Sequence, residues 1–395
     1  MSTSPQQQRI TGHPPLLAVD RLLFVDTRVQ HTVLLLLAVI LCVSATVVMF
    51  KALSRKKRKG EGCVYHSHEG ADMRGKTVVV TGGNAGIGFE TALELSRLGA
   101  RVIVAARCPS KGHAACEAIR RLTGNDRVEF ALLDVGSLAS VRGFANRLLA
   151  SEERLDVLVN NAGIAAPRQK RLTREGIEIT LATNYLGPFL LTNLLLDLLK
   201  RSGPSRVVNV TSSLYRLGRI PWEQLEAPGG GGVSIEYPGV ESTYASSKLL
   251  LNLFSVQLAR QLQGTEVTCN AVHPGVVATT INQKEPGLRH FLWNSFLHTF
   301  GTSPRKGARG SVYLASSPGL REVTGKYFVS CRESSWSRKL LDEETAYEVW
   351  CRSAELVRAV LADADCAGMV AQEAASFAGS TQCGYSTILQ QSAAV

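Results

Sequence analysis

Short aliphatic and β-branched runs are spaced along the central part of the chain, and between them apolar residues recur at helical spacing. The runs show no polar alternation, so both faces of each strand are expected to be buried, as in a parallel sheet covered by helices. The predicted strands are TVVVT at 77–81, RVIVAA at 101–106, VEFALLD at 128–134, LDVLVN at 155–160, SRVVNVTS at 205–212 and EVTCNAVH at 266–273.

Helical spacing is clearest in the segment between the first two strands. Ile87, Thr91, Leu95 and Leu98 fall on one face of a helix, which is the pattern of a crossover between parallel strands. The repeated alternation of strand and helix predicts an α/β fold of the Rossmann type. We expect a doubly wound parallel sheet with helices on both faces, forming a single domain over residues 76–358.

A second hydrophobic segment lies before this domain. Residues 32–50, TVLLLLAVILCVSATVVMF, contain no charged side chain; as a helix they would be about 28 Å long, enough to span a bilayer, which predicts a transmembrane anchor. A cleaved signal peptide is the alternative, because VSA at 43–45 offers a small-residue site. We favour the anchor, since the basic cluster follows the apolar run. The positive-inside rule then makes 1–31 a luminal tail and 51–75 a basic juxtamembrane linker.

The net charge of +11 does not indicate nucleic-acid binding, because no nucleic-acid motif accompanies it. Six of the basic residues directly follow the apolar run: Lys51, Arg55, Lys56, Lys57, Arg58 and Lys59. We interpret these residues as a signal that sets the membrane topology. Contact with anionic lipid is the more specific alternative. The nine cysteines include no CxxC pair, which suits a reducing compartment and predicts no metal site. The Ala-, Ser-, Gln- and Gly-rich residues 359–395 are predicted to be an unstructured tail.

Candidate chemistry begins where the first predicted strand ends, in TVVVTGGNAGIG at 77–88. Gly82, Gly86 and Gly88 permit a tight turn and let the backbone approach a pyrophosphate. The negative charge of that group is met by free N–H groups at the following helix N-terminus. For a glycine cluster taken alone, an ordinary strand-to-helix turn is the alternative.

Residues after the other strands complete a dinucleotide site. Arg107 follows the second strand, where an NAD enzyme has an acidic residue, so a cation there favours the 2′-phosphate of NADP(H); a solvated loop charge is the alternative. Asp134 is placed either to accept from the adenine amino group or to cap the next helix. Asn161, Ala162 and Gly163 end the fourth strand at the ligand-binding edge. A rigid turn and a hydroxyl after the sixth strand suit the nicotinamide amide: Pro274, Gly275 and Thr279.

The proposed acid/base group is a tyrosine with a lysine one helical turn later. Tyr244 and Lys248, in YASSK, lie on one face of a helix. A free phenol has a pKa of about 10, and a nearby ammonium together with an oxidised nicotinamide would lower it; a surface pair is the alternative for this spacing alone. The hydroxyl of Ser212 can bond a substrate carbonyl. Asn184 is a polar residue in an apolar helix, which requires a buried partner or a water to hold.

The chain resembles the classical short-chain dehydrogenases/reductases in motifs that follow one another in the family's order. These are TGxxxGxG at 81–88, NNAG at 160–163, Asn184, Ser212, YxxxK at 244–248 and PG at 274–275. The likeness extends over residues 74–358, and LDVLVNNAGI and SRVVNVTSSLY look like the membrane-anchored retinol dehydrogenase group, including the dehydrogenase/reductase member thirteen type.

The resemblance implies a role for each catalytic residue. Tyr244 would exchange the proton, Lys248 would lower its pKa and hold the ribose, Ser212 would orient the carbonyl, and Asn184 would keep a water in a proton relay. The full predicted cofactor site comprises Gly82, Asn84, Gly86, Ile87, Gly88, Arg107, Asp134, Asn161, Ala162, Gly163, Tyr244, Lys248, Pro274, Gly275 and Thr279.

The same resemblance implies an activity and a location. It implies hydride transfer with NADP(H) between a lipophilic alcohol and its carbonyl, with retinol and retinaldehyde favoured, on the endoplasmic-reticulum membrane with the catalytic domain in the cytosol. A steroid or a fatty aldehyde is the alternative substrate. A non-catalytic, membrane-tethered nucleotide-binding scaffold is the alternative from another class, and a homo-oligomer is compatible with either reading.

Two departures from the family concern the neighbourhood of the substrate. Tyr185 stands where the family usually has histidine after the helix asparagine, and PGGGG at 228–232 lengthens the connection between Ser212 and Tyr244. The aromatic segment HFLWNSFLHTF, 290–300, is predicted to be either an apolar lid that dips into the membrane or part of the ordinary core.

Overall fold

The computed structural model describes residues 71–226, 239–277, 302–329, 331–337, 340 and 342–366. Several predictions fall outside the described residues: the tail 1–31, the anchor 32–50, most of the linker 51–75, the insertion 228–232, Thr279 and the segment 290–300. Among the helices of the described part, none has both the length and the apolar character needed to cross a membrane.

In the described part of the chain, eight strands form a single sheet in the order β3-β2-β1-β4-β5-β6-β7-β8. Neighbouring strands are parallel except for the last pair, which is antiparallel. The strands are β1 (Thr77–Thr81), β2 (Arg101–Ala106), β3 (Val128–Leu132), β4 (Val157–Asn160), β5 (Ser205–Val210), β6 (Val267–His273), β7 (Tyr327–Val329) and β8 (Arg332–Ser334).

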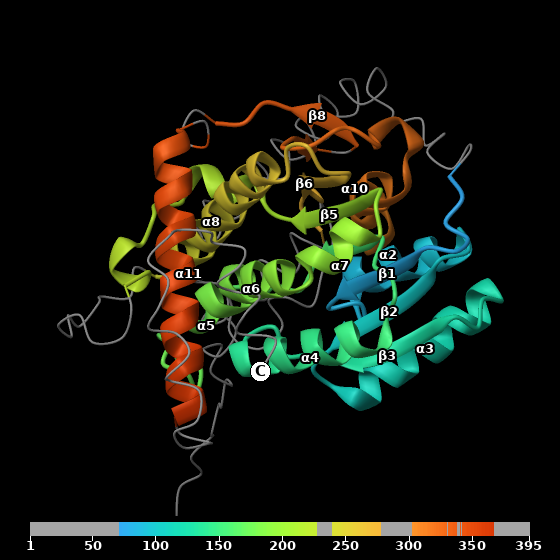
Figure 1. Cartoon of the computed structure of the whole chain (residues 1–395), viewed down its shortest axis with the longest axis horizontal. Coiled ribbons are helices and arrows are strands. Elements are labelled where there is room, and N and C mark those ends of the chain that lie inside the picture. Colours follow the sequence, from blue (N-terminus) through green and yellow to red (C-terminus); the bar gives the residue numbers. More distant parts are fainter. Residues whose placement is uncertain are drawn as a thin grey trace, which may run out of the picture. The chain divides into compact units, whose positions relative to one another are not determined.

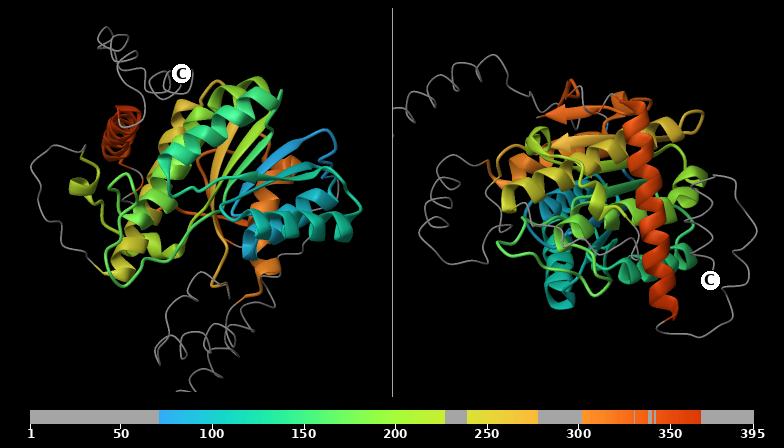
Figure 2. Two further views of the ribbon diagram at one scale, coloured as in Figure 1. Left: turned by 90° about the horizontal axis from the view of Figure 1, so that it is seen from below. Right: turned by 90° about the vertical axis from the view of Figure 1, so that its left-hand side faces the viewer.

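Helices cover both faces of this sheet, as the strand pattern predicted (Figures 1 and 2). The α-helices are α2 (Gly86–Arg97), α3 (Pro109–Thr123), α4 (Leu138–Ser151), α5 (Ile179–Leu181), α6 (Gly187–Leu194), α7 (Leu196–Arg201), α8 (Val240–Gln261), α10 (Pro304–Ser316) and α11 (Glu343–Cys366). A π-helical turn, η1 (Ala182–Leu186), joins α5 to α6, and short 3₁₀ turns are η2 (Ser213–Leu217), η3 (Trp222–Gln224) and η5 (Pro318–Leu320).

Two hydrophobic clusters, one on each side of the sheet, hold these layers together. One cluster joins the sheet to α4, α6, α7, α8 and α11. The other joins it to α2, α3 and α10. All five residues of β1 are buried, which explains why that strand is apolar or β-branched throughout. The predicted doubly wound sheet is therefore confirmed.

The last two strands were not predicted, and the last helix extends further than expected. Strands β7 and β8 have three residues each, too few for a periodic pattern to appear. The predicted start of an unstructured tail at residue 359 is wrong, because α11 continues to Cys366 and buries Val360 and Leu361. The alanines of this segment favour a helix, and the burial of these two apolar side chains stabilises it.

A buried carboxylate ties the beginnings of the two central strands together. Asp156, which is 2% exposed, accepts hydrogen bonds from the Thr77 N–H and from Lys76 Nζ, both at 2.9 Å, and from Arg154. Burial raises the pKa of Asp156, but the hydrogen bonds from Arg154, Thr77 and Lys76 together lower it by more. The net shift of the pKa is therefore downward. These bonds fix the relative position of β1 and β4.

The chain order reverses between β1 and β4. The strands β2 and β3 lie on one side of β1, and the strands from β4 onward lie on the other. In open α/β sheets, ligands bind outside the carboxyl ends of the strands at such a switch point. The predicted site residues should therefore converge at the ends of β1, β4 and β5.

Candidate active site

The turn after β1 has the geometry of a phosphate site. Gly82 and Gly86 have positive φ values of 65° and 57°, which strongly favour glycine. A Cβ added to Gly88 would lie 2.3 Å from the Gly82 carbonyl oxygen, so the turn closes only because that position is glycine. Ala85 caps α2 without a side-chain bond, and the first turn of α2 holds no acidic residue. The N–H groups there suit a pyrophosphate, and the predicted dinucleotide fits.

The ends of β1 and β4 are bonded to each other beside this turn. The Thr81 hydroxyl accepts hydrogen bonds from the Asn161 and Ala162 N–H groups, both at 3.0 Å. The Asn161 side chain donates in return to the Thr81 carbonyl at 2.8 Å. Asn161 is thus a support of the glycine turn. Thr81 is part of the predicted glycine motif, but no role was predicted for this residue. Its position directly before Gly82 is the signal that could have indicated its role.

Arg107 directly follows β2 at the same edge of the sheet. Its side chain is exposed and forms no hydrogen bond or ion pair within the described part of the chain. The guanidinium is therefore available to an anionic ligand, although the structure equally permits the solvated charge that was the alternative.

Asp134 does not cap the helix that follows it. Its Oδ1 accepts from the Gly136 N–H at 3.0 Å, while the cap of α4 is Ser137, whose side chain accepts from Ser140 N. The helix-cap alternative is therefore wrong, because the side chain closes a tighter turn first. Asp134 is exposed, which leaves its carboxylate accessible to a ligand. On the opposite side of the site, Pro274 and Gly275 follow β6, and Gly275 has φ 84°.

Tyr244 and Lys248 lie on α8, which passes over the end of β5. Lys248 is 4% exposed, and its Nζ donates to the Val210 carbonyl at 3.0 Å. The same Nζ lies 5.9 Å from the centroid of the Tyr244 ring. Ser212, two residues after β5, hydrogen-bonds Tyr244 and accepts from the Leu214 N–H at 3.3 Å. The structure thus brings Tyr244, Lys248 and Ser212 together, as predicted.

The pKa of Tyr244 shifts in the direction opposite to the expectation. Burial raises the pKa of the phenol, and the hydrogen bond from Ser212 only partly offsets that rise. Burial also lowers the pKa of Lys248, to about 8. The protein groups alone therefore keep Tyr244 protonated at neutral pH. The predicted lowering also relied on the charge of an oxidised nicotinamide, which the chain itself does not supply.

Asn184 is fully buried in the π-helical turn η1, and its carboxamide forms three hydrogen bonds. Its Oδ1 accepts from the Ile164 N–H at 2.8 Å, and its Nδ2 donates to the Ile164 carbonyl at 2.9 Å and to Ser247 Oγ at 3.0 Å. The buried partner that the sequence required is therefore the backbone after Gly163. Both amide hydrogens are used, so a water held by this side chain would have to donate to Oδ1.

Gly163 shows how closely these groups converge. A Cβ added there would lie 3.2 Å from Asn184 Oδ1 and 3.4 Å from Lys248 Nζ. The end of β4, the π turn and α8 therefore meet at one point. A widened turn at such a place is typical of functional sites.

His273 is a neighbour of the site that the sequence did not single out. Its Nδ1 accepts from the Ser213 N–H at 3.3 Å, and burial lowers its pKa to about 4. A neutral ring is the only form that can accept at Nδ1. His273 thereby connects the turn after β5 to the turn after β6; its position directly before Pro274 is the signal that could have identified it.

Comparisons with known proteins agree with this architecture. A family model described as short chain dehydrogenase matches residues 76–224 and 233–287. Bovine dehydrogenase/reductase SDR family member 13 is 43% identical over 72% of this chain and 74% of its own length. Mouse retinol dehydrogenase 13 is 42% identical, covering 74% of this chain and 86% of its own, and human retinol dehydrogenase 14 is 42% identical, covering 70% and 85%.

Solved structures show the same fold. An uncharacterized protein from Mycobacterium Paratuberculosis aligns with a TM-score of 0.59 at 33% identity, covering 74% of this chain and 97% of its own. A Beutenbergia cavernae protein described as an NAD(P) dependent gluconate 5-dehydrogenase, with bound NADP, aligns with a TM-score of 0.52 at 25% identity, covering 66% and 96%. The chain thus belongs to the short chain dehydrogenase family, as an oxidoreductase related to the retinol dehydrogenases.

Proposed function

We propose that this protein is an NADP(H)-dependent oxidoreductase that interconverts a lipophilic alcohol and its carbonyl, with retinol and retinaldehyde as the favoured pair. The observation that carries the proposal is the convergence of Tyr244, Lys248, Ser212 and Asn184 beside a glycine turn suited to a dinucleotide. A nucleotide-binding scaffold would not require an aligned proton-transfer set, so the scaffold alternative has less support.

Each side chain has a defined task in carbonyl reduction. A reduced nicotinamide, when bound, supplies the hydride. Tyr244 gives its phenolic proton to the carbonyl oxygen, and its raised pKa keeps that proton in place at neutral pH. The Ser212 hydroxyl donates to the oxygen on which negative charge develops. The Lys248 ammonium lies beside the phenolate that remains and stabilises it.

The position of Arg107 supports NADP(H) over NAD(H). An exposed cation directly after β2 is placed to pair with a 2′-phosphate. The Beutenbergia cavernae relative was solved with NADP.

Replacing Arg107 by alanine is expected to raise the KM for NADPH about tenfold or more, because a charge-assisted hydrogen bond to the phosphate is lost. The KM for NADH should change little, since that cofactor has a hydroxyl there. The measurement is steady-state reduction with each cofactor. Arg121→Ala is the control, because Arg121 is an exposed cation near the end of α3. Equal changes in both KM values would show that Arg107 has no role in choosing the cofactor.

Exposed apolar side chains beside the catalytic serine support a lipophilic substrate. Leu214 and Leu217, on η2 directly after Ser212, are 45% and 73% exposed, and Val276, after the turn at Gly275, is 52% exposed. An apolar substrate would cover these side chains and gain by their burial. The same surface would serve a steroid or a fatty aldehyde.

Single-turnover oxidation of NADPH by detergent-solubilised full-length protein tests the function. We expect retinaldehyde to be reduced with a higher kcat/KM than a steroid ketone, a fatty aldehyde or a small soluble aldehyde. Preference for one of the other lipids would reassign the substrate and keep the chemistry. If none of these carbonyls led to oxidation of NADPH, the proposed function would be refuted and the scaffold alternative would be favoured.

A further inference from the structure

Tyr185, the residue that departs from the family pattern, has a specific buried partner in the C-terminal helix. Its hydroxyl lies 2.7 Å from Ser353 Oγ on α11, and the side chains of both residues are fully buried. Ser353 Oγ also lies 2.7 Å from the Val349 carbonyl and donates to it. Because the serine proton is used there, the Tyr185 hydroxyl is the donor to Ser353. Burial also raises the pKa of Tyr185, so this donor stays protonated.

Tyr185 and Asn184 are consecutive residues of the π turn, yet they are anchored to different parts of the molecule. Asn184 is bonded to Ile164 and Ser247, next to Lys248. Tyr185 is bonded to α11 and also contacts Phe189, with ring centroids 6.0 Å apart. A shift of the turn at Tyr185 would therefore move the carboxamide of Asn184.

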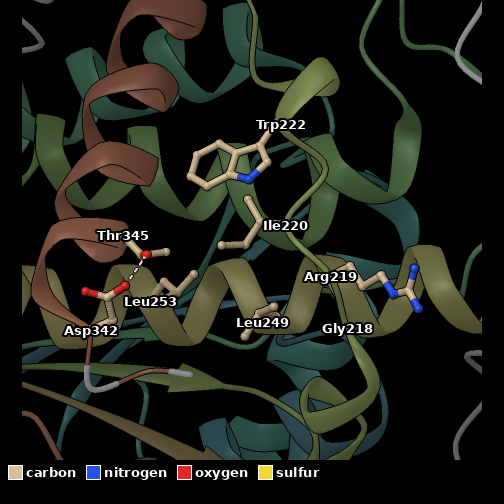
Figure 3. A pocket seen from close by; sticks show the side chains of 8 residues that line it. All are labelled: Gly218, Arg219, Ile220, Trp222, Leu249, Leu253, Asp342 and Thr345. Atoms are coloured by element: carbon tan, nitrogen blue, oxygen red, sulfur yellow. Dashed lines mark hydrogen bonds between the residues drawn. The ribbon is translucent and has the colours of Figure 1, made fainter. Parts of the chain in front are cut away.

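Helix α11 packs against the catalytic layer at this level through an aromatic side chain. The Trp350 ring, one turn before Ser353, lies 5.0 Å from the ring of Phe189 and 5.5 Å from that of Phe254. Toward the start of α11, a cavity of about 350 Å³ is lined by Asp342 and Thr345 and by Leu249 and Leu253 of α8 (Figure 3). Trp350 and Ser353 therefore attach α11 to the catalytic layer next to Tyr185.

We propose that the Tyr185–Ser353 hydrogen bond is a positioning contact through which α11 holds the π turn, and with it Asn184, in place beside Lys248. This inference rests on the proposed function, because Asn184 matters only if the site moves a proton. It assigns α11 a part in catalysis in addition to its part in the core.

The test compares Tyr185→Phe, Ser353→Ala and the double variant in the full chain. Each single variant is expected to lower kcat for carbonyl reduction about tenfold, since small displacements of positioning groups have effects of this size or larger. The KM for NADPH should stay within about twofold, because the glycine turn is untouched. The double variant should lose no more than either single variant, because the two hydroxyls act as one unit.

Two controls remove comparable groups elsewhere. Tyr327→Phe removes a buried hydroxyl that has no hydrogen-bond partner in the described part of the chain. Ser316→Ala removes a helical serine that donates to the carbonyl four residues earlier, Val312, at 2.9 Å. Both should keep the kcat and the pH profile of the unmodified protein. Equal losses in the controls, or unchanged kcat in Tyr185→Phe, would overturn the proposal.

Hydrogen exchange gives a readout that does not depend on turnover. The Ile164 amide donates to Asn184 Oδ1, so its exchange should become faster in Tyr185→Phe if the asparagine is released. Unchanged protection of Ile164 would overturn the positioning role, whatever the activity. If the unmodified protein reduces no carbonyl, the proposed function fails, and the exchange measurement still decides whether Tyr185 holds the turn.

Discussion

Replacing Tyr244 by phenylalanine is expected to lower kcat for carbonyl reduction by about 10²–10⁴-fold, the contribution of a positioned general acid. The ring would still fill the same space on α8, so the protein should remain folded and bind NADPH. The Ser212 hydroxyl would lose its partner but could still bond the substrate. The measurement is single-turnover NADPH oxidation together with an equilibrium titration of NADPH.

The pH profile adds a second check on the same residue. The reductive kcat of the unmodified protein should fall in two steps as the pH rises. The first fall comes when Lys248, whose pKa burial lowers to about 8, loses its proton, and the second when the Tyr244 phenol, whose pKa burial raises above its ordinary value, ionises. The residual activity of Tyr244→Phe should lack the second fall. Tyr313→Phe, on α10, is the control. A Tyr244→Phe variant that keeps most of its activity would refute the acid role.

Replacing Gly88 by alanine is expected to abolish tight cofactor binding, raising the Kd for NADPH at least 100-fold. The added Cβ would lie 2.3 Å from the Gly82 carbonyl oxygen and 2.4 Å from Asn161 Nδ2. One of these contacts is backbone, so the turn itself must open, and the N–H groups at the start of α2 would move from the pyrophosphate. Forcing a group into a filled space also costs about 1–3 kcal/mol of folding stability.

Gly143→Ala, in the middle of α4, is the matched control. A Cβ there meets only the end of the Arg147 side chain, at 3.4 Å, and alanine favours a helix over glycine by about 0.5–1 kcal/mol. That variant should bind NADPH normally and unfold at the same or a higher temperature. Fluorescence titration of NADPH and thermal unfolding measure both effects. Normal NADPH affinity in Gly88→Ala would show that the cofactor does not sit on this turn.

The apolar runs of the sequence were sufficient to predict six strands and their parallel arrangement, because strands buried on both faces leave a strong signal. Predicted and observed ends differ for the third strand, which was expected to reach Asp134 and ends at Leu132. The short pair β7 and β8 and the last turns of α11 leave too little periodicity to be recognised.

The candidate site was predicted where spacing alone determines the neighbours, as with Tyr244 and Lys248 on one helix. Contacts between distant segments could not be derived in the same way. Tyr185 and Ser353 are 168 positions apart, and nothing in the sequence indicates that they meet. The direction of the Tyr244 pKa shift depends on how deeply the fold buries the phenol, which no residue pattern states.

The packing of α11 restricts how two copies of this protein can associate. Trp350 packs against Phe189 of α6 and Phe254 of α8, and Arg260 near the end of α8 pairs with Glu343 at the start of α11. A second molecule could contact the surface of α6 and α8 under Trp350 only if α11 were displaced, which would expose apolar side chains. A contact between two copies should therefore form on the outer surface of α11 or on another face of the protein.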